Sequence, residues 1–209
     1  MPVVTISRMY ASGGSEVATR VAAALDWPLL DNTVVDAVAA RLGVTASEVA
    51  LREERVASLA ERLAEAMALG SQDWLAPLSA GKRAPTDAEV VEVTRRIVEE
   101  ATQRGPVVVV GRGAQAMLAE RSDALHVFCY APRAALVQRS MTRDGLDEAA
   151  ASKLVDETNA HREQYVRKHW NRHWREHANY HLSVNTGWLG VDVAAETVTS
   201  AAKAMLLWG

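Results

Sequence analysis

Several kinds of protein are excluded by what this sequence lacks. Its 209 residues include one cysteine, Cys129, which excludes an internal disulfide framework and a cysteine-rich zinc site. No apolar run approaches the ~20 residues of a membrane-spanning helix. No basic region followed by an apolar stretch marks the first residues as a secretory signal. The formal net charge of −3 gives no reason to expect a nucleic-acid partner. We therefore expect a cytoplasmic protein with neither a membrane nor a nucleic acid as partner.

The apolar residues, 49% of the chain, are enough for a sizeable core. Five short segments that are rich in β-branched residues and bounded by turn residues predict strands. They are residues 3–7, 28–30, 107–110, 125–131 and 181–185. The third is apolar throughout, which is typical of a central strand covered on both faces. Cys129 lies in the fourth, where we expect a buried structural thiol.

Helical patterns separate these segments. Capping boxes at Thr45 and Thr86 predict helices over residues 45–69 and 86–104, joined by a loop over residues 70–85. Further helices are predicted over residues 16–25, 132–143, 147–175 and 191–207. Strands that alternate with helices predict an α/β fold, with a five-stranded parallel sheet and helices on both faces. We expect one domain over residues 1–209, with a helical insertion at about 45–104.

A loop rich in small residues, Arg8 to Glu16 (RMYASGGSE), joins the first strand to the first helix. Glycines let backbone N–H groups approach a phosphate, and the helix dipole adds partial positive charge. The loop nevertheless fails the pattern Gly-x-x-x-x-Gly-Lys-Ser/Thr, because Arg8 takes the first glycine position and Gly14 the lysine position. Glu16 stands near the position of the magnesium-binding hydroxyl. The residues alone leave open a tight turn that binds nothing.

Five blocks of the chain resemble, in order, the cytidylate kinase-like family, a divergent branch of the nucleoside-monophosphate kinases. They are ISRMYASGGSEVATRVAAALDWPLLD, VVVVGRGA, LHVFCYAP, QRSMTRDGLDEAAA and NYHLSVNTGWLG. That family typically opens with Ile-Ser-Arg-Gln-Tyr-Gly-Ser-Gly-Gly-Arg-Glu, so it also lacks the lysine. The resemblance implies a P-loop nucleotide-kinase fold and transfer of the γ-phosphate of ATP, with Mg²⁺, to a nucleoside monophosphate. The acceptor would resemble CMP or dCMP, or be a similar small molecule.

The resemblance also assigns the first loop to the ATP phosphates. The residues expected to bind the cofactor are Arg8, Ser12, Gly13, Gly14, Ser15 and Glu16. Ser15 departs from the family, in which an arginine commonly follows the two glycines, and a serine brings no charge. Either Arg8 points back to the phosphates, or the lid supplies all the cations. The alternative function is a catalytically impaired nucleotide-binding or regulatory protein of the same fold.

The acceptor is expected at Arg112, which follows the third strand at the edge where open parallel sheets bind ligands. Its planar fork suits a phosphate, and in cytidylate kinases a Gly-Arg-Asp at this place contacts the nucleoside monophosphate. Gly113 replaces that aspartate. A structural ion pair is the alternative role for Arg112. Asp31 is expected either to face the acceptor or, like Asn32, to cap the next helix.

A lid over about residues 139–178 is implied by the same resemblance, because nucleotide kinases place closing arginines in this region. The catalytic candidates are Arg139, Arg143 and Arg162, and Arg167 lies in the same region. Arg162 and Tyr165 resemble an Arg-x-x-Tyr pair of the family, in which Asn159 replaces the usual preceding aspartate. A solvated basic face is the alternative.

Histidines at positions 169, 173 and 177 are spaced by four residues, as in some helical metal sites. No carboxylate or cysteine cluster accompanies them, so we expect no metal site and favour a lid face or a contact with another subunit over a nucleic-acid or metal-binding module. Trp74, Trp188 and Trp208 lie in segments read as peripheral and suggest an interface, such as that of a homodimer.

Overall fold

The computed structural model describes residues 1–31, 40, 41, 43 and 87–206. Its strands are β1 (Val3–Arg8), β2 (Leu29–Leu30), β3 (Val107–Val110), β4 (Ala124–Tyr130) and β5 (Leu182–Asn185). They form one sheet in the order β2-β3-β1-β4-β5, and every neighbouring pair is parallel. The predicted five-stranded parallel sheet is therefore confirmed.

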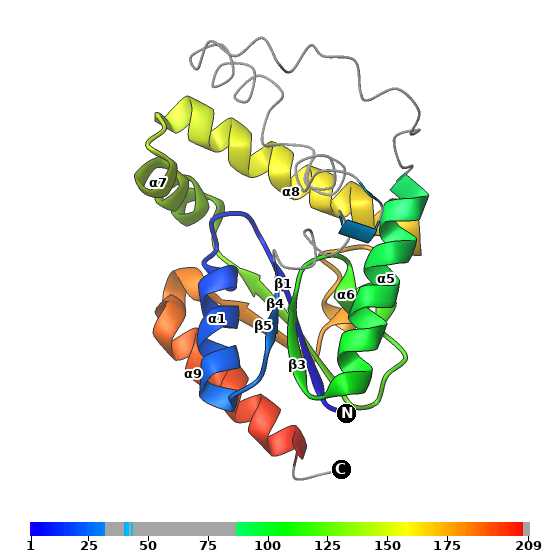
Figure 1. Ribbon diagram of the computed structural model, residues 1–209. Helices are drawn as coiled ribbons and strands as arrows, with labels where there is room; N and C mark the ends of the chain where they lie inside the picture. The colour runs from blue at the N-terminus through cyan, green and yellow to red at the C-terminus, as the bar shows by residue number, and fades with distance from the viewer. Residues whose placement is uncertain (32–39, 42, 44–86, 207–209) are drawn as a thin grey trace.

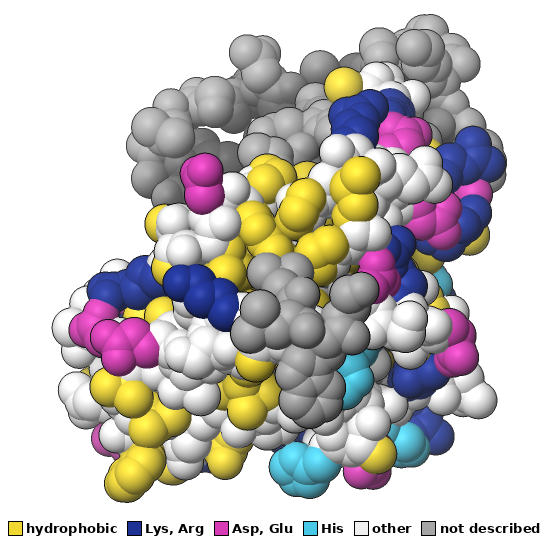
Figure 2. All heavy atoms as spheres, turned by 90° about the horizontal axis from the view of Figure 1, so that it is seen from below, with side chains coloured by type: hydrophobic (Ala, Val, Ile, Leu, Met, Phe, Trp, Pro, Cys, Tyr) yellow, Lys and Arg dark blue, Asp and Glu magenta, His cyan; other side chains and the backbone are white. Residues whose placement is uncertain are grey.

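Helices cover both faces of this sheet. They are α1 (Gly14–Leu25), α5 (Asp87–Arg104), α6 (Ala114–Met117), α7 (Arg133–Asp144), α8 (Glu148–Trp170) and α9 (Thr186–Leu206). Helices α1 and α9 pack together on one face, and α5 and α6 pack on the other (Figure 1). Helices α7 and α8 lie across the end of the sheet at which the strands finish (Figure 1). At the opposite end, seen from below in Figure 2, Lys and Arg are interspersed with Asp and Glu.

The alternation of side chains along the strands divides the core into two layers. Val4, Ile6 and Val108 pack in the layer under α1 and α9. Val3 and Val107 pack in the layer under α5 and α6. Strand β1 is the centre of the sheet, with β3 and β4 as its neighbours, so the carboxyl ends of β1 and β3 lie side by side.

The helix predicted over residues 147–175 is shorter in the structure. Helix α8 ends at Trp170, and Asn171 takes the left-handed conformation with φ 52°. The Asn171 N–H donates to the Arg167 carbonyl and closes the last turn. Asparagine tolerates this backbone conformation better than most residues, which is why the chain turns here. His173 and His177 therefore lie beyond the helix, and the predicted helical histidine series is wrong.

Other boundaries differ by a few residues. Helix α1 begins two residues earlier than predicted, and α9 begins at Thr186 with a break at Gly190, where φ is 75°. The short helix α6 was not predicted. The helix expected over residues 45–69, the loop over residues 70–85, and Asn32, Thr86, Trp74 and Trp208 lie outside the described residues. No helix of the described segments is long and apolar enough to cross a membrane.

A buried valine at the centre of the sheet tests this division of the core. Val108 is fully buried, so Val108→Ala removes two methyl groups from a close-packed layer, and we expect a loss of about 2–3 kcal/mol in the free energy of unfolding. Val193→Ala is the matched control, because Val193 is 46% exposed, and it should cost under about 0.5 kcal/mol. Urea unfolding of both variants measures the difference, and equal losses would contradict the assignment.

Candidate functional site

The loop between β1 and α1 has a fixed backbone and an open helix N-terminus. Ala11 and Gly13 take left-handed conformations, with φ values of 58° and 77°. The Ser12 hydroxyl donates to the Met9 carbonyl at 2.8 Å, and the Thr186 hydroxyl donates to the Ser12 carbonyl at 2.6 Å. Gly13 is the N-cap of α1, and no side chain caps the helix there. The first turn of α1 therefore presents partial positive charge at the carboxyl end of the sheet.

Arg8 ends β1 and turns its guanidinium across this loop. Nε donates to the Ser15 hydroxyl at 3.1 Å, and Nη2 lies 3.9 Å from Asp31 Oδ1. Nη1 lies against Gly111, where a Cβ atom would approach it to 2.1 Å. The side chain is 14% exposed. One cation therefore contacts the loop, the end of β2 and the end of β3, and Ser15 is the residue that holds it at the loop.

Gly14 gives Arg8 the space that this conformation requires. A Cβ atom on Gly14 would lie 2.4 Å from the Cβ of Arg8 and 3.0 Å from the Cβ of Cys129. A lysine at this position would therefore collide with the side chain that supplies the cation. Burial raises the pKa of the Cys129 thiol to about 12, so Cys129 is the neutral packing residue that the sequence predicted.

Arg112 lies on a strained turn after β3. Gly111, Arg112 and Gly113 are all left-handed, with φ values of 68°, 57° and 68°. Such a conformation is unfavourable for an arginine and concentrates at binding sites. Burial, and after it the nearby charge of Arg8, lower the pKa of Arg112 to about 10, while Tyr165 and Asp31 act in the opposite direction. The charges of Arg8 and Asp31 thus both act on Arg112.

Asp31 faces these arginines. Its Oδ1 atom is buried and accepts no hydrogen bond from the described residues, and the Arg8 guanidinium is its ion-pair partner. The structure therefore brings Arg8, Asp31 and Arg112 together, as the sequence predicted for a ligand site at this edge of the sheet.

The ring of Trp170 packs on the turn that carries Arg112. A Cβ atom on Gly113 would lie 2.4 Å from Cη2 of that ring. The indole therefore occupies the space that an aspartate at position 113 would need. No sequence pattern predicts the contact between Trp170 and Gly113. It arises because the end of α8 lies over the turn.

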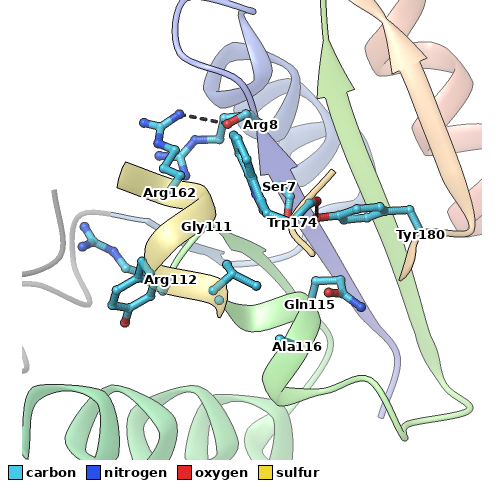
Figure 3. Close-up of a pocket in the computed structure, with 12 residues that line it drawn as sticks. Ser7, Arg8, Gly111, Arg112, Gln115, Ala116, Arg162, Trp174 and Tyr180 are labelled. Atoms are coloured by element: carbon cyan, nitrogen blue, oxygen red, sulfur yellow. Dashed lines mark hydrogen bonds between the residues drawn. The ribbon is translucent and has the colours of Figure 1, made fainter. Parts of the chain in front are cut away.

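Helix α8 also holds the backbone of the first loop. The Tyr10 N–H donates to Asn159 Oδ1 at 2.8 Å, and Asn159 is buried. Arg162 Nη1 donates to the Arg8 carbonyl at 2.9 Å (Figure 3). The structure therefore brings Arg162 to the site, where it contacts the backbone that carries Arg8.

The two arginines of α7 have different surroundings. Arg139 Nη2 pairs with Glu16 Oε1 at 2.5 Å, and a Cβ atom on Gly13 would lie 2.8 Å from Arg139 Nη1. Arg139 therefore lies over the first loop. Arg143 pairs with Asp144 at 2.8 Å and stacks on the Tyr10 ring at 4.6 Å, so it contacts the outer part of the loop.

A pocket opens beside Arg8 and Arg112. Its lining includes Arg8, Arg112 and Arg162 at one end, and Ser7, Gln115, Trp174 and Tyr180 at the other (Figure 3). The pocket lies between the end of the sheet, helix α6 and the last turns of α8. Gln115 and Tyr180 carried no sequence signal for a site.

The histidines of the last segment are dispersed. His169 packs against Tyr165 on α8, whereas His173 contacts Arg167 at 2.9 Å and His177 begins a short 3₁₀ helix. The described segments contain no group of three His, Cys, Asp or Glu residues that could hold a metal ion.

A parallel sheet of this order, with a small-residue loop before α1, defines the P-loop kinase fold. The chain belongs to the cytidylate kinase-like family, whose family model matches residues 3–187. No curated protein sequence matches it.

Solved structures share the fold. An uncharacterized protein from Eubacterium ventriosum ATCC 27560 superposes with a TM-score of 0.70 at 17% identity, covering 98% of this chain and 99% of that one. A gluconokinase from Sinorhizobium meliloti 1021 gives 0.52 at 15% identity, covering 100% and 97%. A shikimate kinase from Bacteroides thetaiotaomicron gives 0.51 at 13% identity, covering 98% of each chain. At these identities the likeness concerns the fold alone.

The contact between Gly111 and Arg8 can be tested with two glycine variants. Alanine at position 111 must keep φ near +68°, which costs about 1 kcal/mol, and its Cβ displaces the Arg8 guanidinium. We expect Gly111→Ala to weaken the binding of inorganic phosphate about tenfold. Gly105→Ala is the control, because nothing lies within 4 Å of its Cβ. Calorimetric titration measures both, and unchanged phosphate affinity in Gly111→Ala would refute the contact's role.

Proposed function

We propose that this protein is a phosphotransferase that moves the γ-phosphate of ATP to a nucleoside monophosphate such as CMP or dCMP, or to a similar small acceptor. The observation that carries the proposal is the convergence of Arg8 and Arg112. Arg8 pairs with Asp31, the charge of Arg8 also acts on Arg112, and the N-terminus of α1 lies at the same edge, so a phosphate dianion would be attracted there. The P-loop kinase fold supports the same reaction class.

The donor is assigned to the first loop. The backbone of Ser12 to Ser15 and the dipole of α1 would hold the phosphates of ATP. The Ser12 N–H donates to the Met9 carbonyl and the Gly14 N–H to the Ser12 hydroxyl, so the N–H groups of Gly13 and Ser15 are the ones proposed to bind. Arg139 lies over Gly13 and would add a cation, and Glu16 fixes that arginine by its ion pair. Glu16 would therefore keep the Arg139 cation near the loop, and this ion pair offsets the repulsion between the Glu16 carboxylate and a phosphate.

Magnesium would come with the nucleotide and could take oxygen ligands at this edge, where Asp31 and Ser15 both contact Arg8. Asp31 Oδ1 is buried without a hydrogen bond from the described residues, and Ser15 offers a hydroxyl at the start of α1. Carboxylate and hydroxyl oxygens are ligands that Mg²⁺ accepts, together with phosphates and water. The ion would neutralise charge on the β- and γ-phosphates when bound.

The acceptor phosphate is assigned to Arg112, with Arg8 between acceptor and donor. Arg8 contacts both the loop and the end of β3, so it is placed to stabilise the charge of the transferred group. Arg143 and Arg162 would act by holding Tyr10 and the Arg8 carbonyl. A phosphate acceptor needs no general base, and positioning with charge neutralisation supplies most of the catalysis.

Titration and turnover distinguish this proposal from a nucleotide-binding protein that does not catalyse. ATP and each nucleoside monophosphate are titrated calorimetrically with and without Mg²⁺, and ADP release is then followed in a coupled assay. Phosphotransfer predicts Mg²⁺-dependent ADP release that requires the acceptor. Binding of both nucleotides without ADP release would instead establish the non-catalytic function.

The assignment of the acceptor rests on Arg112 and is tested by its removal. Arg112→Ala should weaken nucleoside-monophosphate binding by about 10- to 100-fold, the worth of a charge-assisted contact, while ATP affinity stays within about twofold. Arg104→Ala is the matched control, because that exposed arginine ends α5 at the opposite end of the sheet. If the two variants bind the acceptor equally well, the assignment of Arg112 is wrong.

A further inference from the structure

Tyr10 lies in the loop between β1 and α1 and contacts both helices that cross the end of the sheet. Its N–H donates to Asn159 Oδ1 on α8 at 2.8 Å, and its hydroxyl donates to Asp144 Oδ2 at the end of α7 at 3.0 Å. The Arg143 guanidinium lies over its ring, 4.6 Å from the centroid. Tyr10 therefore fixes the loop to α7 through its side chain and to α8 through its backbone.

Asp144 is the acceptor at the centre of the contacts with α7. Besides the Tyr10 hydroxyl, its carboxylate accepts from the Ser140 hydroxyl at 2.8 Å and from Arg143 Nε at 2.8 Å. Burial acts to raise the pKa of Asp144, but the hydrogen bonds from these three residues outweigh it and hold that pKa below its ordinary value. Burial raises the pKa of Tyr10, so the phenol stays protonated. A neutral hydroxyl therefore donates to an ionised carboxylate, which is one of the stronger kinds of hydrogen bond.

The residue after Tyr10 shows what this contact holds in place. Ala11 is buried and left-handed, with φ 58°. A residue other than glycine keeps such a conformation only where its surroundings hold it. Ala11 connects Tyr10 to Ser12, where the proposed donor site begins, and the Thr186 hydroxyl holds the Ser12 carbonyl. The strained backbone is therefore held on both sides, and on one side the hold depends on Asp144.

We propose that Asp144 is a positioning residue for phosphotransfer: by binding the Tyr10 hydroxyl, it keeps the loop between β1 and α1 in the shape that binds the donor phosphates. This inference rests on the proposed function and adds to it a residue that acts through Tyr10. The same carboxylate pairs with Arg143, so the pair brings no net negative charge toward a bound phosphate. The acceptor segment is held by a different contact, that of Trp170 with Gly113, so the effect of Asp144 should be confined to the donor.

A double-mutant cycle on Tyr10→Phe and Asp144→Ala tests the proposal. Tyr10→Phe keeps the ring under Arg143 and removes only the hydroxyl. ATP with Mg²⁺ and CMP are titrated calorimetrically into wild type, both single variants and the double variant. We expect Tyr10→Phe to weaken ATP binding about tenfold, the worth of a charge-assisted hydrogen bond, and to leave CMP affinity within about twofold. In the Asp144→Ala background the same change should alter ATP affinity by less than about twofold, because the hydroxyl has already lost its acceptor.

The matched control is Asp156→Ala, which removes an exposed carboxylate of α8 that pairs with Arg133. It should bind ATP as wild type does. The comparison within each background cancels the other consequence of Asp144→Ala, the release of Arg143 from its ion pair.

Three results would overturn the inference while leaving the proposed function intact. Unchanged ATP affinity in Tyr10→Phe is the first, and it does not depend on how Asp144→Ala folds. The second is a loss of ATP affinity on Tyr10→Phe that is equally large in both backgrounds, since the hydroxyl would then act without Asp144. The third is an equal loss for ATP and CMP in Tyr10→Phe, which would assign the contact to the stability of the fold alone. If wild type binds neither ATP nor CMP, the proposed function fails, and this inference fails with it.

Discussion

The rest of the site depends on the placement of the Arg8 guanidinium between the first loop, Asp31 and the turn that carries Arg112. Arg8 and Arg112 extend from adjacent strand ends, and Asp31 is the acidic group that faces them. Like charges repel more strongly in a partly buried setting than in water. The chain accommodates this through the space at Gly14 and Gly111, and through α8, which holds the Arg8 carbonyl. An anionic ligand at this edge would be attracted by both guanidinium groups, which supports the proposed phosphate site.

The topology of the sheet creates this arrangement. Because β1 and β3 are parallel neighbours, in a register that pairs Ile6 with Val110, the residues that follow them emerge at the same edge. The open N-terminus of α1 lies at that edge, and α8 crosses it with contacts to both turns. Asn159 and Arg162 bind the loop between β1 and α1, and Trp170 packs on the turn that carries Arg112. Helix α8 therefore contacts both segments that we propose bind donor and acceptor. A shift of α8 would change the position of one segment relative to the other.

Local patterns predicted the strands, the small-residue loop and the position of Arg112, because each depends on a few neighbouring residues. The prediction was wrong where a single residue overrides the periodicity. Asn171 stops α8 in a left-handed turn, although the helical pattern continues beyond it. The contacts of Arg8 with the Gly111 turn and of Trp170 with Gly113 could not be predicted either, since the fold brings these residues together over long sequence separations. Gln115 lies in a short helix and carries no pattern that marks it as buried.

The loss of the loop lysine and the presence of Arg8 have one steric cause. A Cβ atom at position 14 would meet the Cβ atoms of Arg8 and Cys129, so this backbone leaves no room for a lysine, or any other side chain, at that position. The two cations also differ in reach. A lysine is a point charge on a flexible stem, whereas the planar fork of arginine offers donors in several directions. Arg8 uses them toward Ser15, Asp31 and the Gly111 turn. The loop therefore has a cation although it lacks the lysine. That cation is Arg8, which also contacts the end of β3.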